Sequence, residues 1–185
     1  YSNRSGKAAE EKISELVKAR KKGRKDIPKS VSKIEVEINE REYGKALVGI
    51  ASLQAKPGSK DTEAVLAGAK ELASRTQLEL DFAFSQFDWM LANGHPIEAQ
   101  EMLEHLGPQL EKNPDYSEKI TSMREAISSV ESKAELKAAK SLLKIEKGIW
   151  KDGGDKKVAK KLRKLAEKNT GTNVAARASY LAGRM

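Results

Sequence analysis

The side chains that could do chemistry in this chain are few, and their spacing argues against catalysis. There are two histidines, His95 and His105, and no cysteine. Glu101 and His105 are four residues apart and would share one helix face, but a dedicated metal site needs three or four ligands, and no second pair lies nearby. His95 precedes Pro96 at an expected turn, where we predict that it is exposed. We therefore predict no catalytic residue, no metal, no cofactor and no enzyme activity.

Two further patterns share only part of the layout of a ligand site. Four glutamates between residues 35 and 42 are close in sequence but would lie on different faces of a helix, which is typical of a solvated acidic surface. Gly153 and Gly154 are followed by Asp155 and not by the Lys-Ser/Thr pair of a phosphate-binding loop. We expect a turn there.

Charge is distributed unevenly along a chain whose net charge is +8. Residues 1–33 contain 11 basic and 4 acidic side chains, residues 34–132 contain 9 and 18, and residues 133–185 contain 15 and 5. Both ends are thus basic and the middle is acidic. Regions of one sign steer association with an oppositely charged partner, although lysine-rich helices also occur simply as solvated faces. We predict weak, salt-sensitive self-association between the basic end of one copy and the acidic middle of the next.

Two basic runs are the strongest signal for a polyanionic ligand, which would be nucleic acid, an anionic envelope surface or an acidic partner. Neither run contains an aromatic residue that would stack on bases, so nucleic acid is the less favoured reading. The candidate anion contacts are Lys18, Arg20, Lys21, Lys22, Arg24, Lys25, Lys157, Lys160, Lys161 and Lys164.

Helical periodicity covers most of the chain, and Pro, Gly or Asn punctuates it every 15–20 residues or so. Val31, Ile34 and Ile38 have the 3–4 spacing of a helix, which we favour over the strand alternation of residues 34, 36 and 38. A capping-box pattern at Ser132 predicts a helix start there. The predicted helices are 8–22, 30–42, 43–56, 60–74 with a possible continuation to 92, 96–111 with Pro108 as a kink or end, 115–131, 133–151, 155–168 and 172–184.

A weak internal repeat organises these helices. Three apolar triplets, each followed by a polar turn, are Ala46/Ile50/Leu53, Ala99/Leu103/Leu106 and Val158/Leu162/Leu165. One helical hairpin cannot bury its apolar face alone, so repeated hairpins stack on one another. We predict an all-α fold of consecutive antiparallel hairpins, as a right-handed solenoid or an irregular bundle. The expected core anchors are among Phe82, Phe84, Phe87, Trp89 and Leu103.

Two segments resemble tetratricopeptide-like repeats. Residues 167–178 (EKNTGTNVAARA) resemble the turn between repeat helices, with Asn169 and Thr170 in place of the usual Tyr-Pro, and residues 42–47 (EYGKAL) resemble a hairpin opening. Their order is similar to the helical tail after a thioredoxin-like domain in exported bacterial proteins of planctomycete type. The resemblance implies a helical-repeat domain over 28–185, a basic segment over 1–27 as the remnant of an upstream domain, and a periplasmic or otherwise exported location, with the cytoplasm as the alternative.

Together these observations favour a non-catalytic scaffold that binds a protein partner or a neighbouring domain. The alternatives are an electrostatic binder of nucleic acid or an anionic envelope, and an accessory region of a thioredoxin-like redox protein. No run of about 18 apolar residues exists, so we predict no membrane span.

Overall fold

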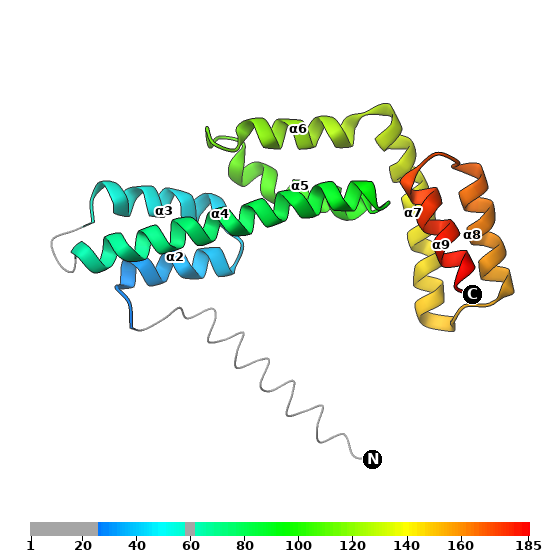
Figure 1. Ribbon diagram of the computed structural model, residues 1–185, viewed down its shortest axis with the longest axis horizontal. Helices are drawn as coiled ribbons and strands as arrows, with labels where there is room; N and C mark the ends of the chain where they lie inside the picture. Colours follow the sequence, from blue (N-terminus) through cyan, green and yellow to red (C-terminus); the bar gives the residue numbers. More distant parts are fainter. Residues whose placement is uncertain (1–25, 58–61) are drawn as a thin grey trace, which may run out of the picture. The chain divides into compact units, whose positions relative to one another are not determined.

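The structure, a computed structural model, describes residues 26–57 and 62–185, and every regular element in this part is an α-helix (Figure 1). The predicted all-helical fold is confirmed, and residues 31–38, where a strand was the alternative, are helical. No helix in the described ranges is long and apolar enough to cross a bilayer. The helices are α2 (Lys29–Asn39), α3 (Tyr43–Ala55), α4 (Thr62–Ala92), α5 (Pro96–Leu110), α6 (Ser117–Ser128), α7 (Val130–Asp152), α8 (Lys156–Lys168) and α9 (Asn173–Gly183).

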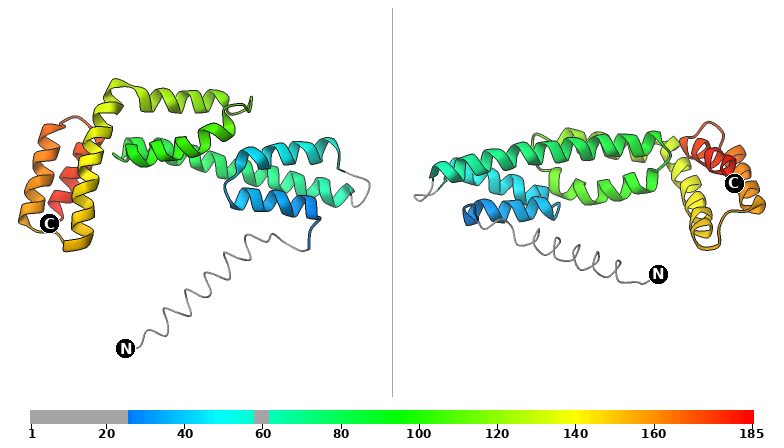
Figure 2. Two further views of the ribbon diagram at one scale, coloured as in Figure 1. Left: turned by 180° about the vertical axis from the view of Figure 1, so that it is seen from behind. Right: turned by 60° about the horizontal axis from the view of Figure 1, so that its bottom comes forward.

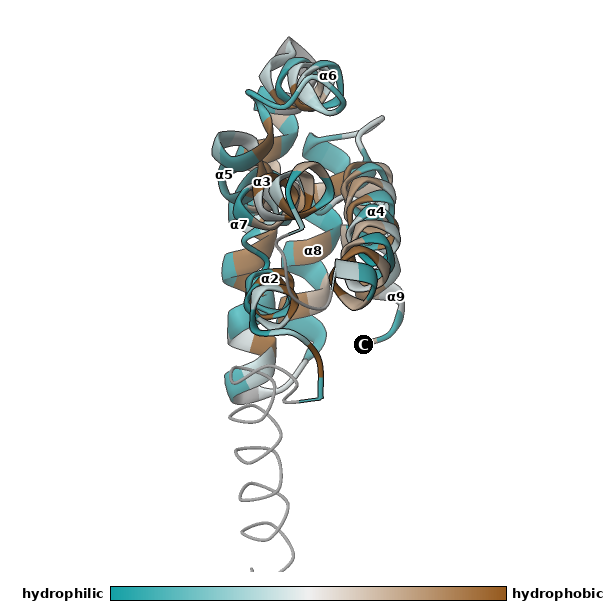
Figure 3. Cartoon of the chain, turned by 90° about the vertical axis from the view of Figure 1, so that its left-hand side faces the viewer, coloured by the Kyte–Doolittle hydropathy of each residue, from teal (hydrophilic) through white to brown (hydrophobic). Residues whose placement is uncertain are grey.

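Burial of an apolar stripe on each helix holds these helices in place. In Figure 3 hydrophobic (brown) and hydrophilic (teal) residues alternate along the helices, as such stripes require. The repeated apolar triplets all turn inward. Their buried members are Ala46, Ile50, Ala99, Leu103, Leu106 and Leu162, and their half-buried members are Leu53, Val158 and Leu165. The solenoid arrangement of the hairpins stays a prediction.

The chain divides into two compact units, and the boundary lies inside α4, between Asp81 and Phe82. The long α4 confirms that the predicted helix of 60–74 continues to residue 92. The predicted basic segment of 1–27 falls almost entirely outside the described residues, so that division of the chain stays a prediction.

The first unit packs the α2–α3 hairpin against the N-terminal part of α4. Its core consists of apolar side chains from all three helices, with Val31, Ile38, Ala46, Leu72 and Leu80 among them. The helices approach closely at Gly68, because a Cβ atom there would lie 2.7 Å from Val31 Cγ1. Two hydrogen bonds join α4 to the hairpin: Arg75 Nη2 donates to Asn39 Oδ1 over 2.7 Å, and the Tyr43 hydroxyl donates to Glu79 Oε2 over 3.1 Å.

The second unit, Phe82–Met185, begins with the end of α4 and the α5–α6 hairpin, and ends with α7, α8 and α9. Figures 1 and 2 both show α7, α8 and α9 lying together as antiparallel neighbours, with α7 and α8 joined by a short turn. The core of these three helices includes Ala138, Leu142, Leu162, Val174 and Ala178.

The α4–α5 turn locks onto the N-terminal end of α9. Gly94 has φ +75°, and a Cβ atom there would lie 2.7 Å from the carbonyl oxygen of Asn173, so only glycine fits. Arg177 on α9 donates to the Gly94 carbonyl over 3.1 Å and to Glu146 Oε1 on α7 over 2.7 Å. Its Nη1 also lies 2.9 Å from His95 Nδ1. The predicted exposure of His95 is therefore wrong, because the ring is half-buried in this junction.

Three of the five expected core anchors are buried, and two are not. Phe84, Phe87 and Leu103 are buried, whereas Phe82 is 70% and Trp89 is 55% exposed, so the prediction that core anchors are among these five is confirmed. The reason for the difference in burial is helical phase. Phe84 and Phe87 share the face of α4 that turns inward, and Phe82 lies about 200° around the helix from Phe84.

Two helix boundaries differ from the prediction. Helix α6 ends at Ser128, because Ser129 has an extended ψ of 158°. Helix α7 therefore begins at Val130 and not at the capping-box pattern of Ser132. Glu135, the acidic member of that pattern, instead accepts hydrogen bonds from the backbone of α9. Pro108, predicted as a kink or an end of its helix, does not end it, since α5 runs two residues past it.

Candidate anion-binding face

The frame of the candidate site is the α7–α8 hairpin, whose turn is fixed by local chemistry. Gly153 occupies the left-handed region with φ +79° after the end of α7. Asp155 then caps α8, because its Oδ1 accepts from the Val158 backbone N–H over 2.8 Å. Ala159, Leu162 and Ala166 anchor α8 in the core. The opposite surface of α8 is left to its charged residues.

A row of lysines runs along α7. The six lysines of this helix recur with spacings of 4, 3, 4, 3 and 4 residues, which keeps them on one face, and the row extends for about 27 Å. Every one of them is exposed. They are Lys133, Lys137, Lys140, Lys144, Lys147 and Lys151.

A second row runs along α8 on the side opposite its buried residues. Lys157, Lys161, Lys164 and Lys168 recur with spacings of 4, 3 and 4 residues, and all four are exposed. This row contains three of the four α8 residues that the sequence singled out. The fourth, Lys160, is exposed as well and lies beside the row. We call the two rows together the lysine face.

A groove joins the two rows. It has a volume of about 480 Å³ and is lined by Lys144 of α7, by Lys157 and Lys161 of α8 and by Asp155 in the turn, together with Ile145 and Val158. Side chains from both helices therefore reach the same hollow. An anionic group in this groove would meet ammonium groups from two sides.

Three acidic residues of this hairpin make internal contacts. Glu135 accepts from the backbone N–H groups of Asn173 and Val174, where a carboxylate also complements the positive end of the α9 dipole. Glu146 pairs with Arg177, and Asp155 caps α8. Glu135 and Glu146 thus serve internal contacts and do not line the groove, whereas the exposed Asp155 does line it.

The lysines of this face have no acidic partner among the described side chains. Two lysines elsewhere in the described ranges do have one, since Lys45 lies 3.0 Å from Glu42 and Lys119 lies 3.2 Å from Asp88. None of the ion pairs seen in residues 26–57 and 62–185 includes a lysine of the lysine face. Like charges brought together without neutralisation repel one another, and an incoming polyanion relieves that repulsion.

A large aromatic side chain borders the α7 row. Trp150 is 90% exposed and lies between Lys147 and Lys151 in the sequence. The two basic runs themselves contain no aromatic residue, and Trp150 lies outside them. The α7 row was missed because its lysines are separated in sequence, and only their 3.6-residue average spacing reveals them.

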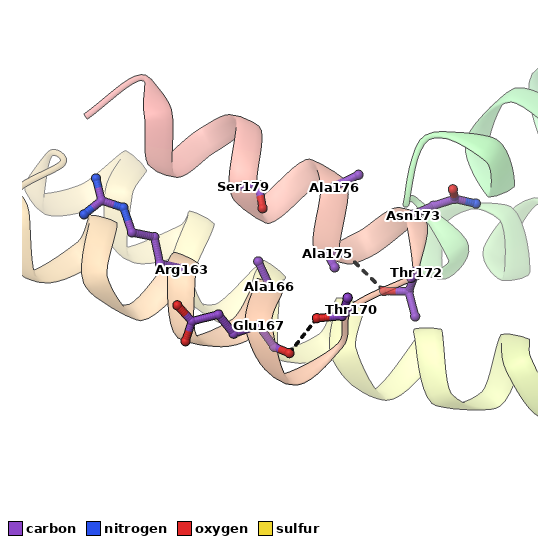
Figure 4. Close-up of a pocket in the computed structure, with 10 residues that line it drawn as sticks. Arg163, Ala166, Glu167, Thr170, Thr172, Asn173, Ala175, Ala176 and Ser179 are labelled. Atoms are coloured by element: carbon purple, nitrogen blue, oxygen red, sulfur yellow. Dashed lines mark hydrogen bonds between the residues drawn. The ribbon is translucent and has the colours of Figure 1, made fainter.

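The hollow between α8 and α9 has a different character (Figure 4). It measures about 610 Å³, and Arg163 and Glu167 line it on the α8 side. Its turn residues already satisfy one another, since Thr172 Oγ1 accepts from the Ala175 N–H over 3.1 Å and the Thr170 hydroxyl donates to the Glu167 carbonyl over 2.8 Å. Thr172 is thus the N-cap of α9, and these groups act as helix caps.

The remaining candidates do not gather into a site. Lys18, Arg20, Lys21, Lys22, Arg24 and Lys25 lie outside the described residues. His105 is exposed, and the amide of Gln109 lies 3.2 Å from its Nε2 atom. Within residues 26–57 and 62–185, no three potential ligands from His, Asp and Glu come close enough to hold a metal ion together.

Comparisons of the chain with protein-family models, with curated proteins and with solved structures found no match. The resemblance to the helical tails of thioredoxin-like proteins therefore stays a prediction. The function has to be inferred from the geometry of the lysine face.

Proposed function

We propose that this protein is a non-catalytic helical scaffold that binds a polyanionic partner on the lysine face of α7 and α8. One observation carries the proposal: two rows of exposed lysines flank a common groove, while Glu135 and Glu146 of α7 are engaged in internal contacts. A face of this kind has an energetic cost from self-repulsion, which a bound polyanion removes.

The proposal narrows the broader expectation of a protein-binding scaffold. A groove lined by apolar side chains would favour a neutral partner helix. The α7–α8 groove is instead bordered by lysines, so it favours a ligand with many closely spaced negative charges. Affinity for such a ligand comes largely from counterion release and falls steeply with added salt.

Heparin retention and affinity for inorganic polyphosphate test the proposal in the full chain. The face variant is Lys144→Gln, Lys157→Gln and Lys161→Gln in combination. Its matched control, with the same change in charge, is Lys56→Gln, Lys70→Gln and Lys112→Gln, three exposed lysines outside α7 and α8. We expect the face variant to elute at lower salt and to bind polyphosphate roughly ten-fold more weakly or worse, at about 0.5–1 kcal/mol per contact.

A third variant separates the other basic run from the lysine face. It carries Lys18→Gln, Arg20→Gln and Lys21→Gln and also removes three charges. Equal losses in all three variants would mean that only net charge matters, and would contradict a defined face. A loss confined to the third variant would transfer the site to the N-terminal run.

A further inference from the structure

We infer that the polyanion of the lysine face is a single-stranded nucleic acid, and that Trp150 is a stacking platform for one of its bases. The inference rests on the proposed function and specifies its ligand. The inference depends on the position and the environment of Trp150. The lysine rows alone give no reason for an exposed tryptophan beside them.

Trp150 lies where a base would follow a bound phosphate. It comes three residues after Lys147, so the two side chains are neighbours on the surface of α7, and Lys151 follows directly. The tryptophan is on the flank of the α7 row that is remote from the groove, about 60° around the helix from Lys147 and about 160° from Gly148, which lines the groove. A strand whose phosphates follow the lysines would thus bring its bases alongside the indole.

The environment of Trp150 distinguishes it from two other exposed aromatic side chains of this unit. Trp89 stacks on His95 with 5.4 Å between ring centroids, and Tyr180 has Arg184 at 5.6 Å from its ring centroid. Trp150 has no ring or cation partner among the described residues, and it is the most exposed of the large hydrophobic side chains there. Both faces of the indole are free to stack.

Other polyanions use this arrangement less well. Binding to a membrane surface would require a broad apolar face on the protein, but Trp150 is the one large exposed hydrophobic residue described on α7 and α8. An acidic peptide would neutralise the lysines without offering a flat ring for the indole. In a duplex the bases are stacked inside, where the indole of Trp150 cannot reach them. Single strands combine backbone charge with free base faces, which is the pattern that charged grooves with aromatic platforms bind.

The test compares two probes of equal charge: an oligothymidylate of about 20 nucleotides, and an abasic strand of the same length. We expect Trp150→Ala to bind the oligothymidylate about 5- to 150-fold more weakly and to bind the abasic strand as the wild type does. Trp150→Phe should restore most of the affinity. Phe82→Ala removes an aromatic residue that is exposed outside the lysine face, and it should change neither affinity.

Fluorescence gives an independent readout, because the chain has only two tryptophans. The oligothymidylate should quench the emission of the wild type, and Trp150→Phe should abolish most of that quenching. Polyphosphate should not quench it.

Several results would overturn the inference and leave the proposed function intact. Trp150→Ala would bind the oligothymidylate as tightly as the wild type, or it would lose equal affinity for the abasic strand. Tighter binding of an oligoglutamate peptide, of phosphatidylserine vesicles or of duplex DNA, with the same dependence on Trp150, would assign the face to that ligand. If the face variant binds polyphosphate normally, the proposed function itself fails.

Discussion

Phe87 and Phe82 lie on the same helix, yet only one of them contributes to the core. Phe87 is 1% exposed and Phe82 is 70% exposed. We expect Phe87→Ala to lower the free energy of unfolding by about 3–5 kcal/mol, because it removes a buried ring and leaves a cavity. Phe82→Ala should stay within about 0.5 kcal/mol of the wild type. Thermal melting of both variants checks this, and equal melting temperatures would contradict the burial pattern.

Glu98 connects stability to pH at the junction of α5 and α9. Burial alone would raise its pKa, but the hydrogen bond from His95 and one from its own backbone N–H outweigh burial, helped by the charges of His95 and Arg177. The pKa therefore lies below its ordinary value of 4.5. A depressed pKa in the folded state means that the ionised carboxylate stabilises the fold above the unfolded pKa, and that this stability is lost as the pH falls through the folded pKa.

Glu98→Gln should consequently melt below the wild type near neutral pH and approach it at about pH 3. The difference should be less than about 1 kcal/mol, because the side chain is more than a third exposed and solvent screens the interaction. Glu104→Gln is the matched control on the same helix, where the exposed carboxylate accepts only from Gln100. A pH-independent deficit in Glu98→Gln would show that the contact is a matter of shape and not of charge.

At the scale of single residues, the sequence predicts the hydrogen bonds that form between near neighbours along the chain. The caps at Asp155 and Thr172 were predictable, because each bonds to a backbone group three residues ahead. The partners of Arg177 were not predictable. They lie 31 to 83 positions away in α7 and in the α4–α5 turn, and only tertiary packing brings them together.

The boundaries of helices likewise depend on whether a capping side chain bonds to its own helix or to a distant one. The Ser132 pattern has the sequence of a capping box, yet its acidic member Glu135 bonds to the N-terminal backbone of α9, which has unsatisfied N–H groups of its own. A distant helix end thus takes the carboxylate that a local cap would have used. In the lysine face, by contrast, the α7 spacing was visible in the sequence, and only the shared groove with α8 required the fold.

Glycines give a prediction for whole elements. Gly94→Ala should destabilise the protein by more than about 1 kcal/mol, because alanine resists φ +75° and its Cβ would lie 2.7 Å from the Asn173 carbonyl oxygen. Gly148→Ala should stabilise it by about 0.5–1 kcal/mol, since the residue is inside α7 and its Cβ would point into open space. Denaturant unfolding measures both, and a stable Gly94→Ala would show that the α4–α5 turn does not lock onto α9.

The whole molecule carries its charges in blocks, which predicts salt-sensitive self-association. Residues 34–132 contain 9 basic and 18 acidic side chains, and residues 133–185 contain 15 and 5. Contact between unlike blocks of two copies would consist of surface ion pairs worth about 0–1 kcal/mol each, screened within about 8 Å at physiological salt. Sedimentation at low and high salt should show mass falling as salt rises. A monomer at both extremes would exclude this assembly.

The salt dependence of binding to an oligothymidylate of about 20 nucleotides tests the lysine face most directly. For a single strand, the slope of log K against log salt is about −0.7 per phosphate neutralised, so loss of Lys144, Lys157 and Lys161 should make the slope about 2 units shallower. The control with Lys56, Lys70 and Lys112 replaced should keep the slope of the wild type. Equal slopes in the two variants would contradict the lysine face as the site of polyanion binding.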